Sequence, residues 1–275
     1  MKFVVLSDNN VSDDNLGSEH GLSIYLEHKG FTYLFDTGAS DLFIKNAKTL
    51  NINLSNVDFV FISHAHSDHI GGLKSFLKIN KKAKVVLSKY ALNRQLYSKR
   101  NGLREIGNSI DYQSYKERML LVEDKPLIGE SFIASHIECD EYPKPKGNSN
   151  LFQNSYNELK PDNFNHEIVV SVGEDKQIVY TGCAHHGLLN MLETARKHTS
   201  EKISLVIGGF HLIDGEDYET HDDIKIIAEF LQHNYSNINI FSGHCTGKNA
   251  KEIFENKLKS WFKSFYVGFK FTNDL

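Results

Sequence analysis

The sequence lacks three features that would each assign it to a particular class of protein. No apolar run approaches the length of a membrane span, and the apolar stretch after Met1 turns polar at Ser7, too early for the core of a signal peptide. The three cysteines form no C-x-x-C pair, so a disulfide framework is not indicated. A formal net charge of −4 gives no basic surface for nucleic-acid phosphates. We therefore expect a cytoplasmic protein that binds neither a membrane nor nucleic acid.

The rest of the composition is ordinary for a globular protein. With 275 residues, 40% of them hydrophobic, the chain can bury one large core or two small ones. No internal repeat or low-complexity tract stands out. Residues 140–165 are rich in Pro, Asn, Lys and Tyr without periodicity, which predicts an insertion loop over the site. We expect its Tyr and Lys side chains to contact the substrate.

Short apolar runs alternate with helical patterns in both halves of the chain. The first half predicts strands over residues 22–28, 31–35, 59–63, 84–88, 120–123 and 131–135, and helices over 41–50, from about 71, and over 90–99. The second half predicts strands over residues 167–172, 177–181, 204–207, 238–242 and 265–271, and helices over 188–198, 222–233 and 248–258. Two β-rich halves that each end in helices favour stacked sheets with helices outside over one parallel sheet.

Histidines follow the predicted strands closely. The chain has 14 histidines, and five local sets come directly after an apolar strand. These sets are His64, His66 and His69; His136; His185; His211; and His244. Ligands in sheet-based folds gather where the carboxyl ends of strands meet. Several imidazoles at one edge of a sheet are what a zinc, iron or manganese site requires.

The run from Ser63 to His69 is the sharpest of these signals. In an extended or turning loop His64 and His66 point the same way and can hold one ion, while Asp68 and His69 can turn toward a second. Three histidines and one aspartate in six residues argue against a polar surface loop with accidental histidines. The Gly71-Gly72 pair is predicted to let the backbone turn tightly into the next helix.

Two further histidines are predicted to be ligands. Glycines flank both His185 and His244, which favours close approach of a ligand or metal at each. For His211 three roles stay open: metal ligand, substrate contact or structural residue. His136 is expected to be structural. The other histidines are expected to be solvated or ordinary loop and strand residues: His28, His166, His186, His198, His221 and His233.

A competing motif occurs at residues 35–38. Phe35-Asp36-Thr37-Gly38 matches the active-site string of aspartic proteases, whose chemistry requires two carboxylates that share a proton. No second copy occurs in the chain, and a homodimer that supplied one would leave the histidines unexplained. We therefore favour a role in which Asp36 accepts a hydrogen bond from a metal-bound imidazole.

Together these residues resemble the metallo-β-lactamase superfamily over nearly the whole chain. The run from His64 to Leu73 matches its H-x-H-x-D-H motif, and residues 35–38 match its upstream Asp element. A narrower likeness, to the subgroup that includes dihydropterin ribofuranosylaminobenzene phosphate synthase, comes from four further motifs. They are Glu19-His20-Gly21-Leu22-Ser23, Thr181-Gly182-Cys183-Ala184-His185, Ile207-Gly208-Gly209-Phe210-His211-Leu212 and Gly243-His244-Cys245-Thr246-Gly247.

The resemblance implies an α+β fold, a four-layer αβ/βα sandwich of two mixed sheets flanked by helices, in a single domain over residues 1–275. It also implies two divalent metal ions, zinc in the first instance, with iron or manganese as alternatives. By position His64, His66 and His185 would bind the first ion, and Asp68, His69 and His244 the second. Many members carry a bridging Asp where this chain has Cys183, so two readings stay open: a ligating or bridging thiolate, or an inert thiol with solvent between the ions.

The resemblance leaves more than one function open. The leading hypothesis is metal-assisted hydrolysis of a small ester, a phosphoester in the first instance, with Asp68 orienting the water and His211 binding charged oxygens. His20 is a further candidate for substrate binding. The alternative is a transferase that acts on a phosphorylated or pterin-like small molecule. A di-iron redox site is disfavoured because flavin-linked di-iron relatives carry Glu where this chain has His66. A degenerate metal-binding module is disfavoured because the ligand positions other than Cys183 are intact.

Overall fold

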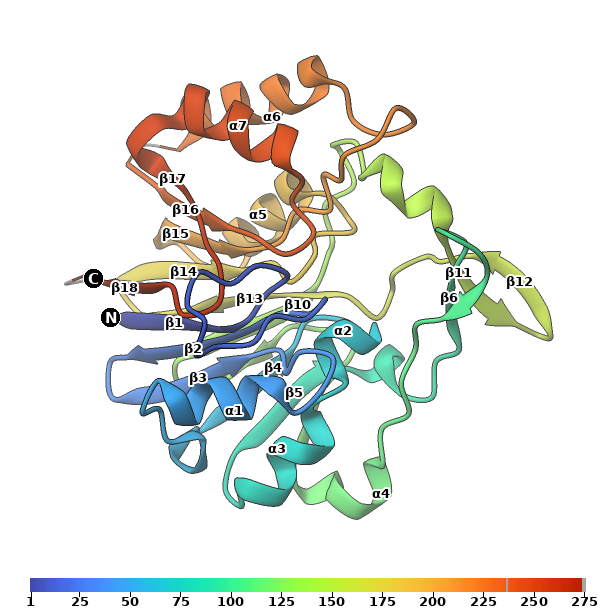
Figure 1. Ribbon diagram of the computed structural model, residues 1–275, viewed down its shortest axis with the longest axis vertical. Helices are drawn as coiled ribbons and strands as arrows, with labels where there is room; N and C mark the ends of the chain where they lie inside the picture. Colours follow the sequence, from blue (N-terminus) through green and yellow to red (C-terminus); the bar gives the residue numbers. More distant parts are fainter. Residues whose placement is uncertain (236, 274–275) are drawn as a thin grey trace.

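Two seven-stranded β-sheets face each other in the computed structural model, which describes residues 1–235 and 237–273 (Figure 1). The first sheet has the order β18-β1-β2-β3-β4-β5-β8. Its strands are Lys270–Thr272 (β18), Lys2–Ser7 (β1), Ser23–His28 (β2), Phe31–Phe35 (β3), Phe59–Ile62 (β4), Lys84–Ser88 (β5) and Met119–Val122 (β8). The predicted hairpin of residues 22–35 is confirmed, because β2 and β3 pair antiparallel with His28 opposite Phe31.

The second sheet is built mainly from the C-terminal half of the chain. Its order is β17-β16-β15-β14-β13-β10-β9. Its strands are Phe262–Ser264 (β17), Asn239–Ser242 (β16), Lys202–Gly208 (β15), Lys176–Tyr180 (β14), Ile168–Val172 (β13), Phe132–His136 (β10) and Leu127–Ile128 (β9). Each sheet is mixed, since both parallel and antiparallel pairs occur in it.

Helices cover the outer face of each sheet, which gives the four predicted layers. The longer helices are Leu42–Thr49 (α1) and Leu73–Ile79 (α3) on the first sheet, and Leu188–Lys197 (α5), His221–Asn234 (α6) and Lys248–Leu258 (α7) on the second. Two short helices, Ser67–Ile70 (α2) and Tyr112–Tyr115 (α4), lie in loops. In the part of the chain that the structure describes, no helix is both long and apolar enough to cross a membrane.

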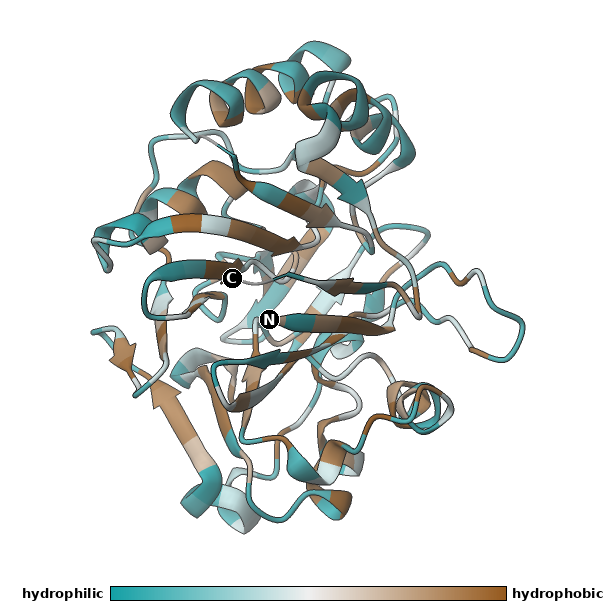
Figure 2. Cartoon of the chain, turned by 90° about the vertical axis from the view of Figure 1, so that its left-hand side faces the viewer, coloured by the Kyte–Doolittle hydropathy of each residue, from teal (hydrophilic) through white to brown (hydrophobic). Residues whose placement is uncertain are grey.

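The apolar side chains form three layers of core that match this arrangement. One cluster fills the space between the sheets, and it includes Phe3 and Phe61 from the first sheet and Tyr180 from the second. The other two clusters lie between each sheet and its helices. Figure 2 shows the same distribution, with hydrophobic colour along the inner strands and hydrophilic colour on the outward helix faces. Burial on both faces explains why the strands read as continuous apolar runs rather than as alternating ones.

A third, four-stranded sheet projects from the body beside the edge where the two large sheets open (Figure 1). Its order is β12-β11-β6-β7, with strands Glu158–Pro161 (β12), Leu151–Ser155 (β11), Leu96–Ser98 (β6) and Arg104–Glu105 (β7). We call this sheet the flap. The segment predicted as a loop over residues 140–165 therefore contains a β-hairpin, and the partner of that hairpin is a segment about fifty residues earlier in the chain.

The helix predicted over residues 90–99 was wrong. Good helix formers fill this segment, but Asn93 adopts a left-handed conformation with φ 55°, which ends any helix there. Leu96 and Ser98 then pair with Gln153 and Leu151 of β11. A distant strand therefore decides the conformation, as is common where local propensity is weak.

The final strand, predicted over residues 265–271, was also wrong in its extent. Two short strands occur instead: β17 ends just before this stretch and pairs with β16 in the second sheet, while β18 overlaps its last two residues and pairs with β1 in the first. Gly268, with φ 87°, lies in the connection between them. The chain thus crosses from one sheet to the other, which a single apolar run in the sequence does not reveal.

Candidate metal centre

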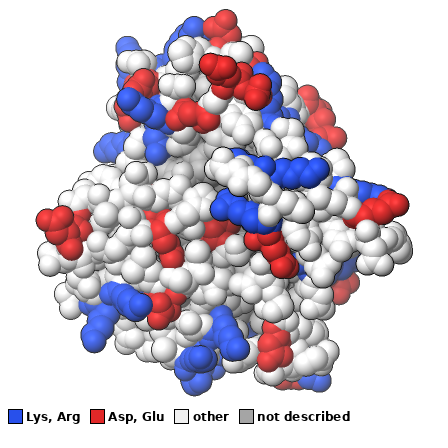
Figure 3. Space-filling model, turned by 45° about the vertical axis from the view of Figure 1, so that its right-hand side comes forward, with Lys and Arg blue, Asp and Glu red and all other residues white. Residues whose placement is uncertain are grey.

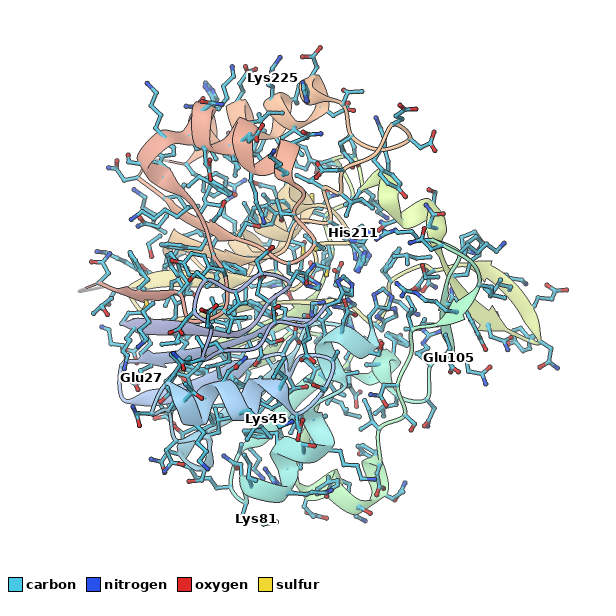
Figure 4. All side chains as sticks on the ribbon, viewed as in Figure 1. Glu27, Lys45, Lys81, Glu105, His211 and Lys225 are labelled. Carbon is cyan, nitrogen blue, oxygen red and sulfur yellow. The ribbon has the colours of Figure 1, made fainter. Side chains whose placement is uncertain are left out.

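The predicted ligands come from strands that end at the same edge of the molecule. Strands β3, β4 and β5 run parallel in the first sheet, and β14, β15 and β16 run parallel in the second. The loop after β4 carries His64, His66, Asp68 and His69; the loop after β14 carries Cys183 and His185; the loops after β15 and β16 carry His211, His244 and Cys245. Figure 4 shows His211 at this edge, facing the flap.

The first predicted ligand set converges on one point. The Nε2 atom of His64 lies 3.1 Å from Nδ1 of His66, and the rings of His64 and His185 have their centroids 4.9 Å apart. Donor atoms of His64, Cys183 and His185 all lie within 4.8 Å of one another. The three histidines predicted to share one ion are thus brought together, with the thiol beside them.

The second predicted set meets next to the first. The Nε2 atoms of His69 and His244 lie 3.1 Å apart, and Oδ2 of Asp68 lies 3.3 Å from Nε2 of His244. The Sγ atom of Cys183 lies 3.1 Å from Nε2 of His69. Cys183 therefore has donor atoms of both sets around it, the position in which a bridging ligand would lie.

Polar partners hold the outward nitrogens of these imidazoles. Nδ1 of His69 lies 2.6 Å from Asp36 Oδ2, Nδ1 of His185 lies 2.9 Å from Asn148 Oδ1, and Nδ1 of His244 lies 3.0 Å from Asn9 Oδ1. This leaves Nε2 of His69, His185 and His244 directed inward, and among the described residues Nε2 of His185 has no hydrogen-bond partner. His66 is oriented the other way, because its Nδ1 faces His64 and its Nε2 lies 3.7 Å from Asp162 Oδ2. Fixed outer nitrogens with free inner ones are the arrangement of metal-binding histidines. The donor set of imidazole, carboxylate and thiol fits divalent transition metals.

Asp36 has the contacts of a residue that orients a ligand and none of the contacts of a protease carboxylate. Its Oδ1 accepts a hydrogen bond from Ser63 N at 2.8 Å, and its Oδ2 accepts one from Ser63 Oγ at 2.6 Å as well as one from Tyr180 Oη. The residue is fully buried behind His69 and has a left-handed φ of 54°. Its carboxylate does not line the cleft described below, and of the predicted ligands it contacts His69.

Burial sets the protonation of the histidines. Burial lowers the pKa of His64 well below its usual value, and the imidazoles of His69 and His66 lower it further. Burial and the neighbouring His211 lower the pKa of His185 in the same way. Burial raises the pKa of Asp68, but His69, His244 and His20 outweigh it and hold the pKa well below its usual range. His244 is the exception, because burial lowers its pKa but its hydrogen bond with Asp68 and the nearby Cys245 outweigh this and raise the pKa to about 9. Neutral imidazoles and an ionised carboxylate are the protonation states that bind metals, so a metal would have to displace the His244 proton.

The two buried thiols Cys183 and Cys245 lie against each other, with their Sγ atoms 3.3 Å apart. Burial raises the pKa of Cys183 well above its usual value, and contact with Cys245 adds to this. For Cys245 the same burial is outweighed by contacts with Cys183 and His211, which hold its pKa well below its usual range. The backbone N of His211 donates to Cys245 Sγ at 3.2 Å. Cys245 appeared in the sequence only as part of a motif, and its proximity to Cys183 becomes visible when β14 and β16 join one sheet.

Two further residues at the site were missed. His166, expected to be an ordinary loop residue, is fully buried, and its Nε2 lies 3.1 Å from Asp162 Oδ2. The same carboxylate oxygen lies 3.7 Å from Nε2 of His66. The spacing of Asp162 and His166, four residues apart just before β13, was the available signal. It was masked by the reading of residues 140–165 as a loop.

The reason given for Gly71 and Gly72 was wrong. Both adopt ordinary helical angles, with φ −58° and φ −80°, so no left-handed turn requires a glycine. The requirement is close packing: a Cβ on Gly71 would lie 2.2 Å from the Ala39 carbonyl oxygen, and one on Gly72 would lie 2.2 Å from that of Thr37. The glycines let the histidine loop lie directly against the loop that follows Asp36.

His66, His185 and His244 line the floor of a cleft of about 450 Å³, whereas His64 and His69 are fully buried and not part of its lining. His20 lies at its rim, largely exposed, with Nε2 3.3 Å from Asp68 Oδ2. His211 lines the cleft as well, and among the described residues neither of its ring nitrogens has a partner. His136 instead lies outside the cleft, with its Nε2 2.8 Å from Ser88 Oγ. Figure 3 shows the hollow on this face, beside the lobe formed by the flap.

The expectation that Tyr and Lys side chains of residues 140–165 contact the substrate was wrong. The cleft lining takes Leu151 from this segment, and none of its Tyr or Lys residues. Tyr142, Lys144 and Lys146 border a separate apolar hollow next to α6. The side chains that close the cleft on this side come from β6, β7 and the turn between them.

Comparison with known proteins agrees with this architecture. A curated protein of Methanocaldococcus jannaschii, named 7,8-dihydropterin-6-methyl-4-(beta-D-ribofuranosyl)-aminobenzene-5'-phosphate synthase, is 30% identical over 266 residues, which cover 91% of this chain and 89% of that protein. The crystal structure of Tm1679, described as a metal-dependent hydrolase of the beta-lactamase superfamily, is 31% identical, with a TM-score of 0.79 and 99% of both chains covered. A diphosphatase of the PhnP family shares the fold, with a TM-score of 0.53 and 14% identity over 100% of this chain and 98% of that one.

The family itself follows from a match over most of the chain. The model of the metallo-beta-lactamase superfamily matches residues 16–219, which contain the histidine run, Cys183, His185 and His211. His244 lies beyond the match but belongs to the same cluster of side chains. The chain therefore belongs to the metallo-β-lactamase superfamily.

Proposed function

We propose that the protein is a metal-dependent hydrolase whose dinuclear centre acts on a small ester, in the first instance a phosphoester. In this proposal His64, His66 and His185 hold one ion, and Asp68, His69 and His244 hold the other. The observation that carries it is the convergence of these six side chains at one edge of the two sheets. Four of them, His66, Asp68, His185 and His244, line the cleft, and Nε2 of His185 has no partner among the described residues. Burial of such polar side chains costs free energy unless a cation or hydrogen bonds compensate for the lost water.

The residues at the cleft have different roles in the proposed reaction. Bound divalent cations would supply a water of lowered pKa and stabilise charge on the attacked group. Asp68 is ionised, and its Oδ2 lies within 4 Å of His20, His69 and His244, so it can accept a proton or a hydrogen bond from a water at the cleft floor. His211 can donate to charged oxygens of the substrate through a ring nitrogen that no protein group occupies.

Zinc is the cation that this donor set favours, with iron and manganese as alternatives. Imidazole and thiolate ligands suit zinc, whereas manganese prefers oxygen donors. Cys183 would offer a sulfur donor within reach of both groups of ligands. The proposal of a soft, tightly held metal rests on this residue.

The alternative function is a transferase that acts on a pterin-like or phosphorylated small molecule. It is favoured by the relative named as an aminobenzene-5'-phosphate synthase, which the chain matches over almost all of its length. The cleft has the size of a small-molecule site in either case. Incubation of the metal-loaded protein with a dihydropterin and a phosphorylated aminobenzene riboside, followed by mass spectrometry, would reveal a joined product; hydrolysed ester in its place favours the hydrolase.

The central experiment pairs His66→Ala with His136→Ala. Both remove a histidine from the end of a strand, but His136 is bonded to Ser88 outside the cleft. We expect His66→Ala to reduce the metal content and to abolish hydrolysis of bis(p-nitrophenyl) phosphate together, while His136→Ala keeps both. Hydrolysis that persists in metal-free protein would refute the proposal.

A further inference from the structure

The hairpin of β6 and β7 supplies one wall of the cleft. The turn between the strands, residues 99–103, is tight because Asn101 and Gly102 adopt positive φ angles of 61° and 98°. The hairpin lines the cleft with Ser98, Arg100, Arg104 and Glu105, across from the histidines. Figure 4 shows Glu105 on this flap, opposite His211 on the body.

Arg100 is in an unusual electrostatic position within this wall. Its Nε and Nη2 atoms are buried, and among the described residues neither has a hydrogen-bond partner. No carboxylate of the described chain makes an ion pair with it either, since the ion pairs of the molecule involve other residues. A guanidinium stays charged at any physiological pH, and a buried charged group without a partner is costly. Arg100 therefore has no anionic partner among the described residues, and an anion bound in the cleft could fill that role.

The two cationic side chains nearest to Arg100 in the sequence, Lys99 and Arg104, have different surroundings. Arg104 also lines the cleft, but it is exposed to solvent and its charge is therefore hydrated. Lys99, the residue before Arg100, instead places its Nζ over the ring of Phe152, 4.0 Å from the centroid. Lys99 thus has an aromatic partner, whereas Arg100 lines the cleft with two guanidinium nitrogens that have no partner among the described residues.

We propose that Arg100, assisted by Arg104, forms a subsite for an oxyanion of the substrate, a phosphate or carboxylate group separate from the bond that reacts at the histidines. The planar fork of the guanidinium matches such groups with two parallel hydrogen bonds. This inference rests on the proposed function, since it names the class of substrate that the same cleft takes: small esters with a second anionic group. The subsite would fix the orientation of the substrate and exclude neutral esters.

Phenyl phosphate and benzoate are suitable probes, because each presents one oxyanion on the same ring. Their affinities for the metal-loaded protein are measured by calorimetry in wild type and in the variants Arg100→Ala, Arg100→Lys and Lys99→Ala. We expect Arg100→Ala to weaken binding by roughly tenfold or more, the effect of one lost charge-assisted hydrogen bond. Arg100→Lys keeps the positive charge but loses the planar guanidinium, so its affinity for the probes should lie between those of wild type and Arg100→Ala. Lys99→Ala removes the same charge from the same turn and should bind as wild type.

The inhibition constant of phenyl phosphate against hydrolysis of bis(p-nitrophenyl) phosphate should rise by the same factor in Arg100→Ala, with metal content unchanged. If Arg100→Ala weakens the binding of only one probe, the group on that probe, phosphate or carboxylate, is the preferred ligand. If it weakens the binding of both probes, the subsite accepts either oxyanion. Equal affinities in wild type and Arg100→Ala, or an equal loss in Lys99→Ala, would overturn the inference. A wild-type protein that binds the probe through Arg100 but hydrolyses no ester refutes the proposed function and keeps the subsite.

Discussion

Cys183 occupies the position at which the resemblance to the metallo-β-lactamase superfamily predicts an aspartate. Its Sγ is shared by the two groups of donor atoms, one with His64 and His185 and the other with His69 and His244. An aspartate in that place offers two oxygens that can each face one ion, whereas a cysteine offers a single, softer sulfur. If the sulfur bridges, the two ions lie closer to a common donor, and the loss of Cys183 should affect both of them.

A serine at position 183 tests this directly. We expect Cys183→Ser to lower the affinity for the second equivalent of metal at least tenfold, because a hydroxyl is a poor substitute for a thiolate. The cobalt-substituted protein should lose its thiolate-to-metal charge-transfer band at the same time. Cys139→Ser is the matched control, since Cys139 is also a buried free thiol but lies beside Thr194. A cobalt band and metal stoichiometry that survive Cys183→Ser but not Cys245→Ser would assign the ligand to Cys245 instead.

At the scale of elements, the contact between two loops holds the histidine run in place. The loop after β3 and the loop after β4 touch backbone to backbone, with the Thr37 N donating to the His69 carbonyl at 2.7 Å and the Gly72 N donating to that of Gly38 at 3.2 Å. A side chain at position 72 would separate them, since its Cβ would lie 2.2 Å and 2.4 Å from the carbonyl oxygens of Thr37 and Ser40.

We therefore expect Gly72→Ala to cost about 1–3 kcal/mol of unfolding free energy, as overpacked sites do, and to reduce metal content because His69 moves. The unfolding midpoint in urea and elemental analysis measure the two effects. Gly30→Ala is the control: its Cβ would meet nothing within 4 Å, but its φ of 85° imposes strain. It should lose about 1–2 kcal/mol with its metal content intact. Full metal occupancy in Gly72→Ala would show that this contact does not position the histidines.

Most of the elements could be predicted from the sequence because their patterns are local. Apolar runs such as residues 59–62 and the amphipathic period of residues 221–234 decide strand and helix without outside help. The errors lie where a distant partner decides. Residues 96–98 become a strand because β11 pairs with them, and the chain end splits into two strands because each sheet offers an open edge.

In the candidate site, too, the features set by local sequence could be predicted and those set by long-range contacts could not. Histidines placed at strand ends were predictable, because parallel strands must deliver their following residues to one edge. Asn9 and Asn148, which hold His244 and His185, were not, since nothing in their local sequence marks them and their role arises from contacts across 235 and 37 positions. Arg100 was missed for a similar reason: the segment just before it, residues 90–99, was predicted as a helix, and only the flap brings it to the cleft.

At the scale of the whole molecule, the centre joins the two sheets. His64, His66 and His69 extend from the first sheet, while His185 and His244 extend from the second. Between them the sheets otherwise share an apolar core and hydrogen bonds such as those of Tyr33 with Ser131 and of Tyr180 with Asp36. A cation held by both sets would cross-link the halves of the sandwich at their open edge, so its effect on stability should be spread over both sheets.

Removal of the metal should therefore lower the stability of the whole protein. A ligand that binds only the folded state at a hundred times its dissociation constant contributes about 2.7 kcal/mol, so chelation should lower the melting temperature and added zinc should restore it. Hydrogen exchange should rise together in the loops after β4, β14 and β16, which belong to different sheets, while β12 at the far side of the flap stays unchanged. His66→Ala serves as the control, because a protein that already lacks one ligand should respond less to chelation. Exchange that rises in one sheet alone would mean that the ions, if bound, do not tie the halves together.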